Sequence, residues 1–135
     1  MSNEPFTCGL EAALAVIGGK WKLLILYYLA HDNRRYGVLK RCLPGVSNKM
    51  LIQQLKELQA DGVVDRTDYM EIPPRVDYAL TPFGRSLARS LAPLCAWGEE
   101  HSAMIAAVVS RRNGVSDSDR HGVDQPELRR RSDRD

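Results

Sequence analysis

The sequence of 135 residues lacks the features that mark several common classes of protein. None of its apolar runs reaches the roughly 18 residues that a helix needs to cross a bilayer. The N-terminus, MSNEPFTCGLEAAL, has no basic leader followed by a long apolar stretch, so no secretory signal is visible. We therefore expect a cytoplasmic protein that does not associate with membranes.

Cysteine is scarce, and its three residues are Cys8, Cys42 and Cys95. The number is odd, no CxxC pair is present, and no cysteine stands near a histidine at zinc-ligand spacing. A disulfide framework or a structural metal site is therefore not expected, and the thiols should be reduced. Cys42 and Cys95 are expected to pack in the core.

Clusters of catalytic residues are missing as well. The three histidines are scattered along the chain, at His31, His101 and His121. None is spaced with a cysteine or a carboxylate as a nucleophile–base pair or a metal site. The sequence therefore predicts no enzyme, no metal and no cofactor. The formal net charge of +2 is small, so it permits nucleic-acid binding without requiring it.

What the sequence does contain is a series of apolar helical patterns separated by turn signals. Helical periodicity predicts helices at about 8–17, 20–31 and 37–43. A fourth helix should begin after Ser47, whose hydroxyl can cap it, and end at Asp61–Gly62.

The second half of the chain predicts a hairpin and a long helix. Strands are expected at 63–72 and 75–81, with Pro73–Pro74 at the tip between them. Thr81–Pro82 should open the last helix, because proline in a first turn loses no hydrogen bond. That helix is expected to carry a single apolar stripe from Leu87 to Val109.

This order of elements is the layout of a winged helix–turn–helix. The expected fold class is mainly α with a small β-hairpin wing, an α+β arrangement. We expect one domain over 1–112, which includes dimerisation helices. Residues 113–135 are polar and rich in both charges, so they predict a disordered polar tail. An RRR run in the tail could touch phosphates, but a solvated tail is favoured.

The fourth helix is the candidate DNA-reading element. With its three leucines turned inward, periodicity places a polar face outward. Asparagine and glutamine can pair with adenine, lysine can reach guanine or phosphate, and isoleucine can pack on a thymine methyl group. Alone, such a face is as readily a solvated surface, but the preceding short helix and the following hairpin favour DNA binding. The candidate contacts on this helix are Ser47, Asn48, Lys49, Ile52, Gln53 and Lys56.

Three arginines outside this helix are further candidates. Arg34 and Arg35 precede the short helix and are candidate contacts to the DNA backbone. Arg75 follows the two prolines at the hairpin tip, where a wing could lay it on a phosphate or in the narrower groove.

Three blocks of the sequence resemble the HxlR-type family of MarR-like bacterial winged-helix transcriptional regulators. They are IGGKWKLLIL, LPGVSNKMLIQQLKELQADGVVDR and PPRVDYALTPFGRSL, and the match covers about residues 7–101. The resemblance implies a repressor-type regulator that binds double-stranded DNA at a palindromic operator. It also implies a homodimer that pairs through its N- and C-terminal helices, with the fourth helix in the major groove and the hairpin as the wing.

The resemblance also bears on Cys8. Family members typically carry a cysteine just before the first helix, and in members that sense oxidants or electrophiles this thiol is the switch. Here Gly9 follows, where the family commonly has proline. A thiol at a helix N-terminus lies at the positive end of the helix dipole, which favours the thiolate, and Lys20 or Lys22 could add to this. The alternative is a small apolar filler.

Two alternatives remain to a DNA-binding regulator whose DNA affinity is switched by modification of Cys8. One is regulation by a small molecule, whose pocket would lie between the dimer helices. Its candidate lining residues are Trp21, Tyr27, Tyr28 and Trp97, although aromatic residues at such places more often form core or interface. The other is a winged helix that is used only for protein contacts. The outer face of the fourth helix has few acidic residues, which disfavours this function.

Overall fold

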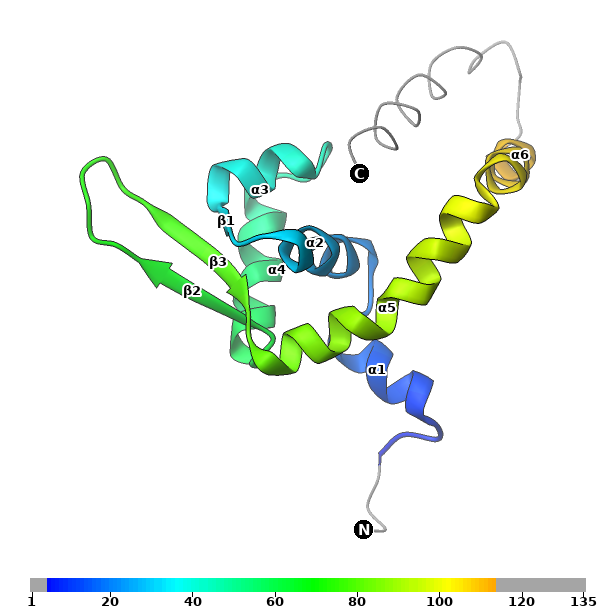
Figure 1. The fold of residues 1–135 in the computed structure, drawn as a ribbon, viewed down its shortest axis with the longest axis horizontal. Coiled ribbons are helices and arrows are strands. Elements are labelled where there is room, and N and C mark those ends of the chain that lie inside the picture. The colour runs from blue at the N-terminus through cyan, green and yellow to red at the C-terminus, as the bar shows by residue number, and fades with distance from the viewer. Residues whose placement is uncertain (1–4, 114–135) are drawn as a thin grey trace. The chain divides into compact units, whose positions relative to one another are not determined.

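The structure is a computed structural model that describes residues 5–113, and Figure 1 shows its elements in chain order. Three helices and a short strand come first: α1 Gly9–Ile17, α2 Lys20–His31, β1 Arg34–Arg35 and α3 Tyr36–Cys42. The reading-helix candidate and the hairpin follow: α4 Asn48–Ala60, β2 Val64–Asp68 and β3 Val76–Leu80. Two further helices are α5 Pro82–Glu100 and α6 Ser102–Asn113. The described part of the chain is therefore a winged helix–turn–helix, as predicted.

The helix α4 begins and ends where the sequence predicts. The Ser47 hydroxyl oxygen accepts a hydrogen bond from the backbone N–H of Met50 at 3.0 Å, which satisfies a donor of the first turn. At the other end Gly62 adopts a positive φ of 78°, a conformation that glycine reaches without strain. Between these ends, three leucines at helical spacing are almost fully buried: Leu51, Leu55 and Leu58.

The hydrophobic core lies between α2, α4 and the sheet. Ile25, Leu26 and Leu29 of α2 are buried against it, as the strongly apolar sequence of that helix predicts. Lys22, on the same helix, is almost buried, and its Nζ lies 2.6 Å from a carboxylate oxygen of Glu57 on α4. This ion pair ties the two helices together, and it lowers the pKa of Glu57.

The sheet has three antiparallel strands in the order β1-β3-β2, so β1 joins the hairpin at its open edge. Arg34 pairs with Tyr78, and Val64 with Leu80. The prediction that the first hairpin strand, over 63–72, reaches residue 72 is wrong, because β2 ends at Asp68. The Asp68 carboxylate accepts from the backbone N–H of Met70 at 2.9 Å, and Met70 has a φ of 55°. This local turn ends the ladder.

The helix α5 starts as predicted, with Thr81 as its cap. The Thr81 hydroxyl accepts from the backbone N–H of Gly84 at 2.9 Å and donates to the carbonyl of Gly62 at 2.6 Å. The prediction of one continuous helix to Val109 is wrong, because the helical run breaks at His101. Gly98, a weak helix former, lies three residues before the break.

The chain divides into two compact units between Ala92 and Pro93. The second unit comprises the end of α5 and the whole of α6 among the described residues, and much of its apolar surface is exposed. Cys95 is exposed there, so the prediction that it packs in the core is wrong, whereas Cys42 is half-buried beside the core of the first unit. The predicted polar tail covers 113–135, and all of it except Asn113 lies outside the described residues.

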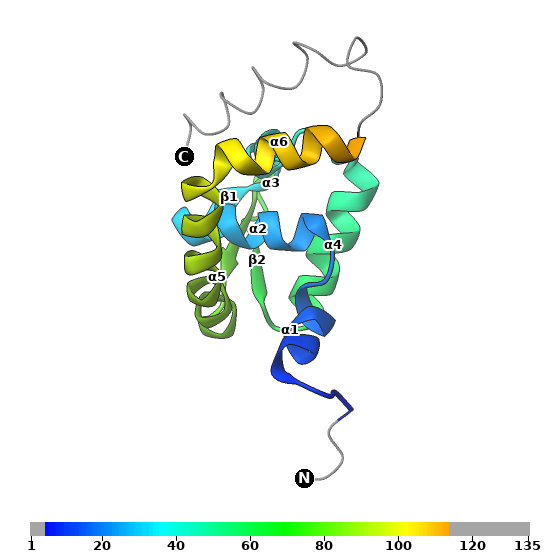
Figure 2. The same ribbon diagram turned by 90° about the vertical axis from the view of Figure 1, so that its right-hand side faces the viewer.

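Within residues 5–113 no single helix is long and apolar enough to span a membrane. The helices α1 and α2 meet the length and composition criterion for a span only when taken together, and they are bent by 84° relative to each other. Core helices also meet this criterion. Figure 2 shows the bend between them.

Gly84 is expected to be indispensable. A Cβ atom at this position would lie 2.1 Å from the carbonyl oxygen of Val63, a backbone atom that accepts from the N–H of Thr81. Gly84→Ala should therefore lower the free energy of unfolding by at least about 2 kcal/mol, as measured by urea denaturation.

Gly98→Ala is the matched control, because it lies on the same helix and a Cβ there has no described atom within 4 Å other than its two chain neighbours and the backbone of its own helix. Alanine also favours helix over glycine, so this variant should be as stable as the wild type or more so. Equal stability of the two variants would show that α5 does not approach Val63 as described.

Candidate nucleic-acid interface

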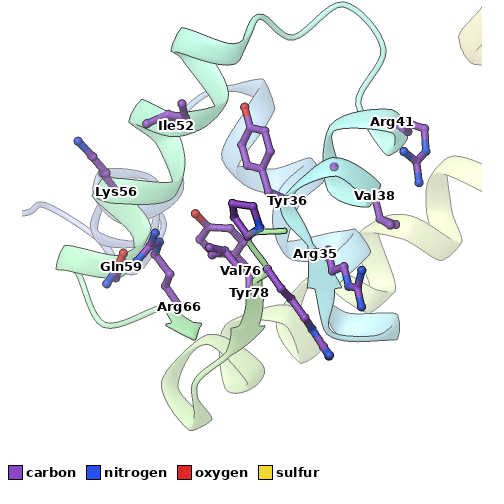
Figure 3. A pocket seen from close by; sticks show the side chains of 13 residues that line it. Arg35, Tyr36, Val38, Arg41, Ile52, Lys56, Gln59, Arg66, Val76 and Tyr78 are labelled. Atoms are coloured by element: carbon purple, nitrogen blue, oxygen red, sulfur yellow. The ribbon is translucent and has the colours of Figure 1, made fainter. Parts of the chain in front are cut away.

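A cavity of about 800 Å³ opens between α3, α4 and the hairpin. Figure 3 shows it with side chains of α4 on one side, those of β1 and α3 on the other, and tyrosines between them. The lining residues are Arg35, Tyr36, Gly37, Val38, Arg41, Ile52, Lys56, Gln59, Arg66, Pro74, Arg75, Val76 and Tyr78.

The lining residues carry charge of one sign only. Five are cationic and none is a carboxylate: Arg35, Arg41, Lys56, Arg66 and Arg75. Cations gathered over a helix, a turn and a hairpin create a positive potential that attracts a polyanion from several directions. The arrangement fits a phosphate backbone running past α4.

Within the described residues, three of these cations have no hydrogen bond or ion pair: Arg35, Arg41 and Lys56. The other two are held on the hairpin. Arg66 lies 3.8 Å from Asp68, and Arg75 donates to Asp77 at 3.2 Å. The guanidinium of Arg75 also lies over the ring of Tyr69, at 4.2 Å from its centroid. Its hydrogen bond to Asp77 raises the pKa of Arg75.

The outer face of α4 carries the predicted reading residues. Asn48, Lys49, Ile52, Gln53 and Lys56 are all exposed. Ile52 and Lys56 reach into the cavity, whereas the other three are not among its lining residues. This face is therefore available to a ligand along its whole length.

Two amides on α4 are already hydrogen-bonded. Gln53 donates from Nε2 to a carboxylate oxygen of Glu57 at 3.2 Å, and Glu57 is held in turn by Lys22. The hydroxyl of Tyr36 donates to Oδ1 of Asn48 at 2.7 Å. Both amides are thus oriented before any ligand arrives.

The two arginines before α3 have different surroundings. Arg34 is half-buried, and its Nε donates to the backbone carbonyl of Tyr28 at 3.1 Å, so it joins β1 to the end of α2. Arg35 is exposed and lines the cavity. Of the two, Arg35 has the better position for a phosphate.

Among the lining residues that sequence reasoning did not propose, four carry a guanidinium or a phenol hydroxyl: Tyr36, Arg41, Arg66 and Tyr78. Arg41 could have been found, because burial of Leu39 on α3 and of Leu43 at its C-cap turns it outward. Arg66 and Tyr78 are cross-strand partners, so finding them required the register of the hairpin.

Cys8 is the exposed N-cap residue of α1, and its own side chain makes no capping hydrogen bond. The residue before it is tied to the first turn, since Glu11 accepts from both the backbone N–H and the hydroxyl of Thr7, at 2.7 and 2.6 Å. The two lysines considered as partners of Cys8 have other contacts: Lys22 pairs with Glu57, and Lys20 lies over the ring of Trp21.

The four aromatic residues proposed for an effector pocket do not line the cavity. Tyr27 and Tyr28 meet edge to face at 4.9 Å in the first unit, whereas Trp97 stacks on His101 at 4.8 Å in the second. A pocket between dimer helices stays a prediction. Among residues 5–113, no group of three His, Cys, Asp or Glu side chains is placed to hold a metal ion.

Comparison with known proteins matches this architecture to one family. The model of the HxlR-like helix-turn-helix family matches residues 16–105. The uncharacterised HTH-type transcriptional regulator YtcD of Bacillus subtilis (strain 168) is 50% identical over 101 residues, which are 75% of this chain and 80% of that protein. The crystal structure of a putative HTH-type transcriptional regulator, ytcD, superposes on this chain with a TM-score of 0.65. The match covers 71% of this chain and 98% of the ytcD chain.

Two regulators with solved structures are also similar. The redox regulator HypR in its reduced form is 38% identical, with a TM-score of 0.69, over 74% of this chain and 99% of HypR. In its oxidised form the identity is 42%, the TM-score 0.65 and the coverage 69% and 96%. Reduced YodB from B. subtilis is 31% identical, with a TM-score of 0.60, over 70% of this chain and 94% of YodB.

Proposed function

This chain belongs to the HxlR-like helix-turn-helix family of DNA-binding transcriptional regulators, and we propose that it represses transcription as a homodimer on a palindromic operator. The observation that carries the proposal is the cavity beside α4, whose five cations have no carboxylate among them. In this proposal the outer face of α4 enters the major groove and the hairpin contacts the neighbouring backbone.

The contacts divide into two kinds. Asn48, Lys49, Ile52 and Gln53 contact base edges, since the N-terminal part of a recognition helix is the part that reaches them. The three unpaired cations of the cavity, Arg35, Arg41 and Lys56, contact phosphates instead, and they set affinity and register without reading sequence. Arg66 and Arg75 extend the positive surface along the hairpin.

Arg41→Gln tests the phosphate contacts. The probe is the DNA upstream of the protein's own gene, and binding is measured by fluorescence anisotropy over a range of salt concentrations. The variant should bind more weakly, and its plot of log K against log salt should be shallower by about 1, because one fewer counterion is released. Arg89→Gln is the control with the same change in charge, since Arg89 is exposed on α5 and does not line the cavity.

The same assay tests the reading face. Lys49→Ala combined with Gln53→Ala should abolish the preference for that DNA over an unrelated duplex at physiological salt. Unchanged binding would show that α4 is not the reading helix. Transcription from this DNA in vitro should fall when the protein is added, and a rise would make the protein an activator.

Homodimer formation is supported by apolar side chains that a single chain leaves exposed. On α1, Leu10 and Leu14 are 69% and 49% exposed, although they share a face with the buried Ile17. In the second unit, Leu94 and Trp97 are 60% and 52% exposed. A second copy that pairs through these helices would bury both surfaces.

Sedimentation equilibrium should give the mass of two chains for the wild type. Leu10→Glu combined with Leu14→Glu should give one chain, because carboxylates would be buried in the interface. Met70→Glu with Ile72→Glu is the control, since these residues are at least as exposed but lie on the hairpin tip. A monomeric wild type would contradict the proposal.

Redox or electrophile control through Cys8 is the regulatory part of the proposal. It is supported by the exposure of Cys8 at the start of α1 and by the similarity to HypR, whose oxidised and reduced forms are described as those of a redox regulator. A quinone would add to the Cys8 thiolate: a C–S bond forms, the C=C π bond of the quinone breaks, and its electrons move to a carbonyl oxygen, which takes a proton from water.

A quinone or diamide should release the wild-type protein from its DNA, and Cys8→Ser should stay bound under the same treatment. Mobility shift measures both. Cys95→Ser is the control, because Cys95 is the other exposed thiol among the described residues, and it should behave as the wild type. Equal release of wild type and Cys8→Ser would assign the switch to another group.

A further inference from the structure

The first residues of α3 and α4 are joined by one side-chain hydrogen bond. Tyr36 begins α3 and Asn48 begins α4, and the Tyr36 hydroxyl donates to Oδ1 of Asn48 at 2.7 Å. The bond spans twelve residues of sequence and bridges the two helices of the helix–turn–helix at their N-terminal ends. Figure 3 shows the Tyr36 ring standing in the cavity between them.

Both partners of this bond are held in place. The Tyr36 side chain is half-buried and packs against the core, so its hydroxyl has a fixed position. Burial also raises the pKa of Tyr36, which keeps its proton in place for donation. The backbone of Asn48 is fixed because Ser47 caps the helix directly before it.

An asparagine amide has distinct sides. Its oxygen accepts hydrogen bonds, and its nitrogen donates two. A free asparagine reads adenine by using both sides together, accepting from N6 and donating to N7. The Tyr36 hydroxyl takes one of the two lone pairs of this oxygen and fixes the plane of the amide, so the amide cannot turn to the bidentate geometry and the nitrogen is the group left fully available to a ligand.

We propose that Tyr36 is a positioning residue that orients Asn48 so that this side chain reads DNA as a hydrogen-bond donor only. The proposal rests on the function proposed above, in which α4 enters the major groove. Asn48 then selects base edges that present acceptors with no donor on the same base, which are N7 and O6 of guanine or O4 of thymine. Adenine also has an acceptor at N7, but its N6 donor lies beside it and opposes the N–H groups of the amide. Asn48 disfavours cytosine, whose edge presents a donor, and it loses the bidentate pairing with adenine that an unconstrained asparagine offers.

Selection from a library of random duplexes tests this directly, and four proteins are compared: wild type, Asn48→Ala, Tyr36→Phe and Tyr78→Phe. The base pair whose preference disappears in Asn48→Ala is the one that Asn48 reads. At this base pair the wild type should prefer guanine or thymine. In Tyr36→Phe the ratio of adenine to guanine should rise by about tenfold, because the freed amide can turn to the bidentate geometry.

Tyr78→Phe is the matched control, since Tyr78 lines the same cavity and its hydroxyl is not the partner of Asn48. It should leave the base preference unchanged. Phenylalanine keeps the packed ring of Tyr36, and thermal unfolding of each variant confirms that it is folded.

Three results would overturn the inference. A wild type that prefers adenine at the Asn48 position would show that Oδ1 is free to accept. A Tyr36→Phe variant that binds every sequence more weakly by the same factor would show a structural role alone. An Asn48→Ala profile identical to that of the wild type would show that Asn48 reads no base. Each leaves sequence-specific DNA binding through α4 standing, whereas a wild type that selects no sequence would remove both.

Discussion

The burial of three leucines on α4 is the constraint on which the proposed DNA-binding surface depends. Leu51, Leu55 and Leu58 fit against α2 and the sheet, so the helix has only one rotation about its axis that fills the core. That rotation turns the polar residues of α4 outward as a set. The ion pair between Lys22 and Glu57 then ties the outer edge of α4 to the central helix. The packing of the three leucines therefore determines which residues of α4 face outward.

The cavity joins residues that are distant in the sequence into one positive surface. Arg35 and Arg41 come from the segment before the turn, Lys56 from α4, and Arg66 and Arg75 from the hairpin. A groove with cations on both sides and no carboxylate lining it raises the local concentration of a polyanion. The proposal that this polyanion is DNA is supported by membership of the HxlR-like helix-turn-helix family.

Local signals were sufficient to predict most of the fold. The cap at Ser47, the turn at Gly62 and the cap at Thr81 each rest on chemistry within a few residues, and each is found in the structure. The errors arose where the deciding contact was less visible in the pattern. The end of β2 depends on a hydrogen bond from Met70 to the Asp68 side chain, and helical periodicity continued past the break at His101. The bond from Tyr36 to Asn48 is non-local, so periodicity carries no trace of it.

The braced hairpin tip has a consequence for the thermodynamics of binding. Arg75 is held at once by Asp77 and by the ring of Tyr69, and its backbone carbonyl accepts from the N–H of Tyr69 at 3.0 Å. A tip ordered in this way gives up its conformational freedom during folding. Less freedom then remains to be lost when a ligand is bound, and an interaction of modest strength yields a tighter complex. Loosening Tyr69 would therefore weaken association through entropy, without removing a single contact to the ligand.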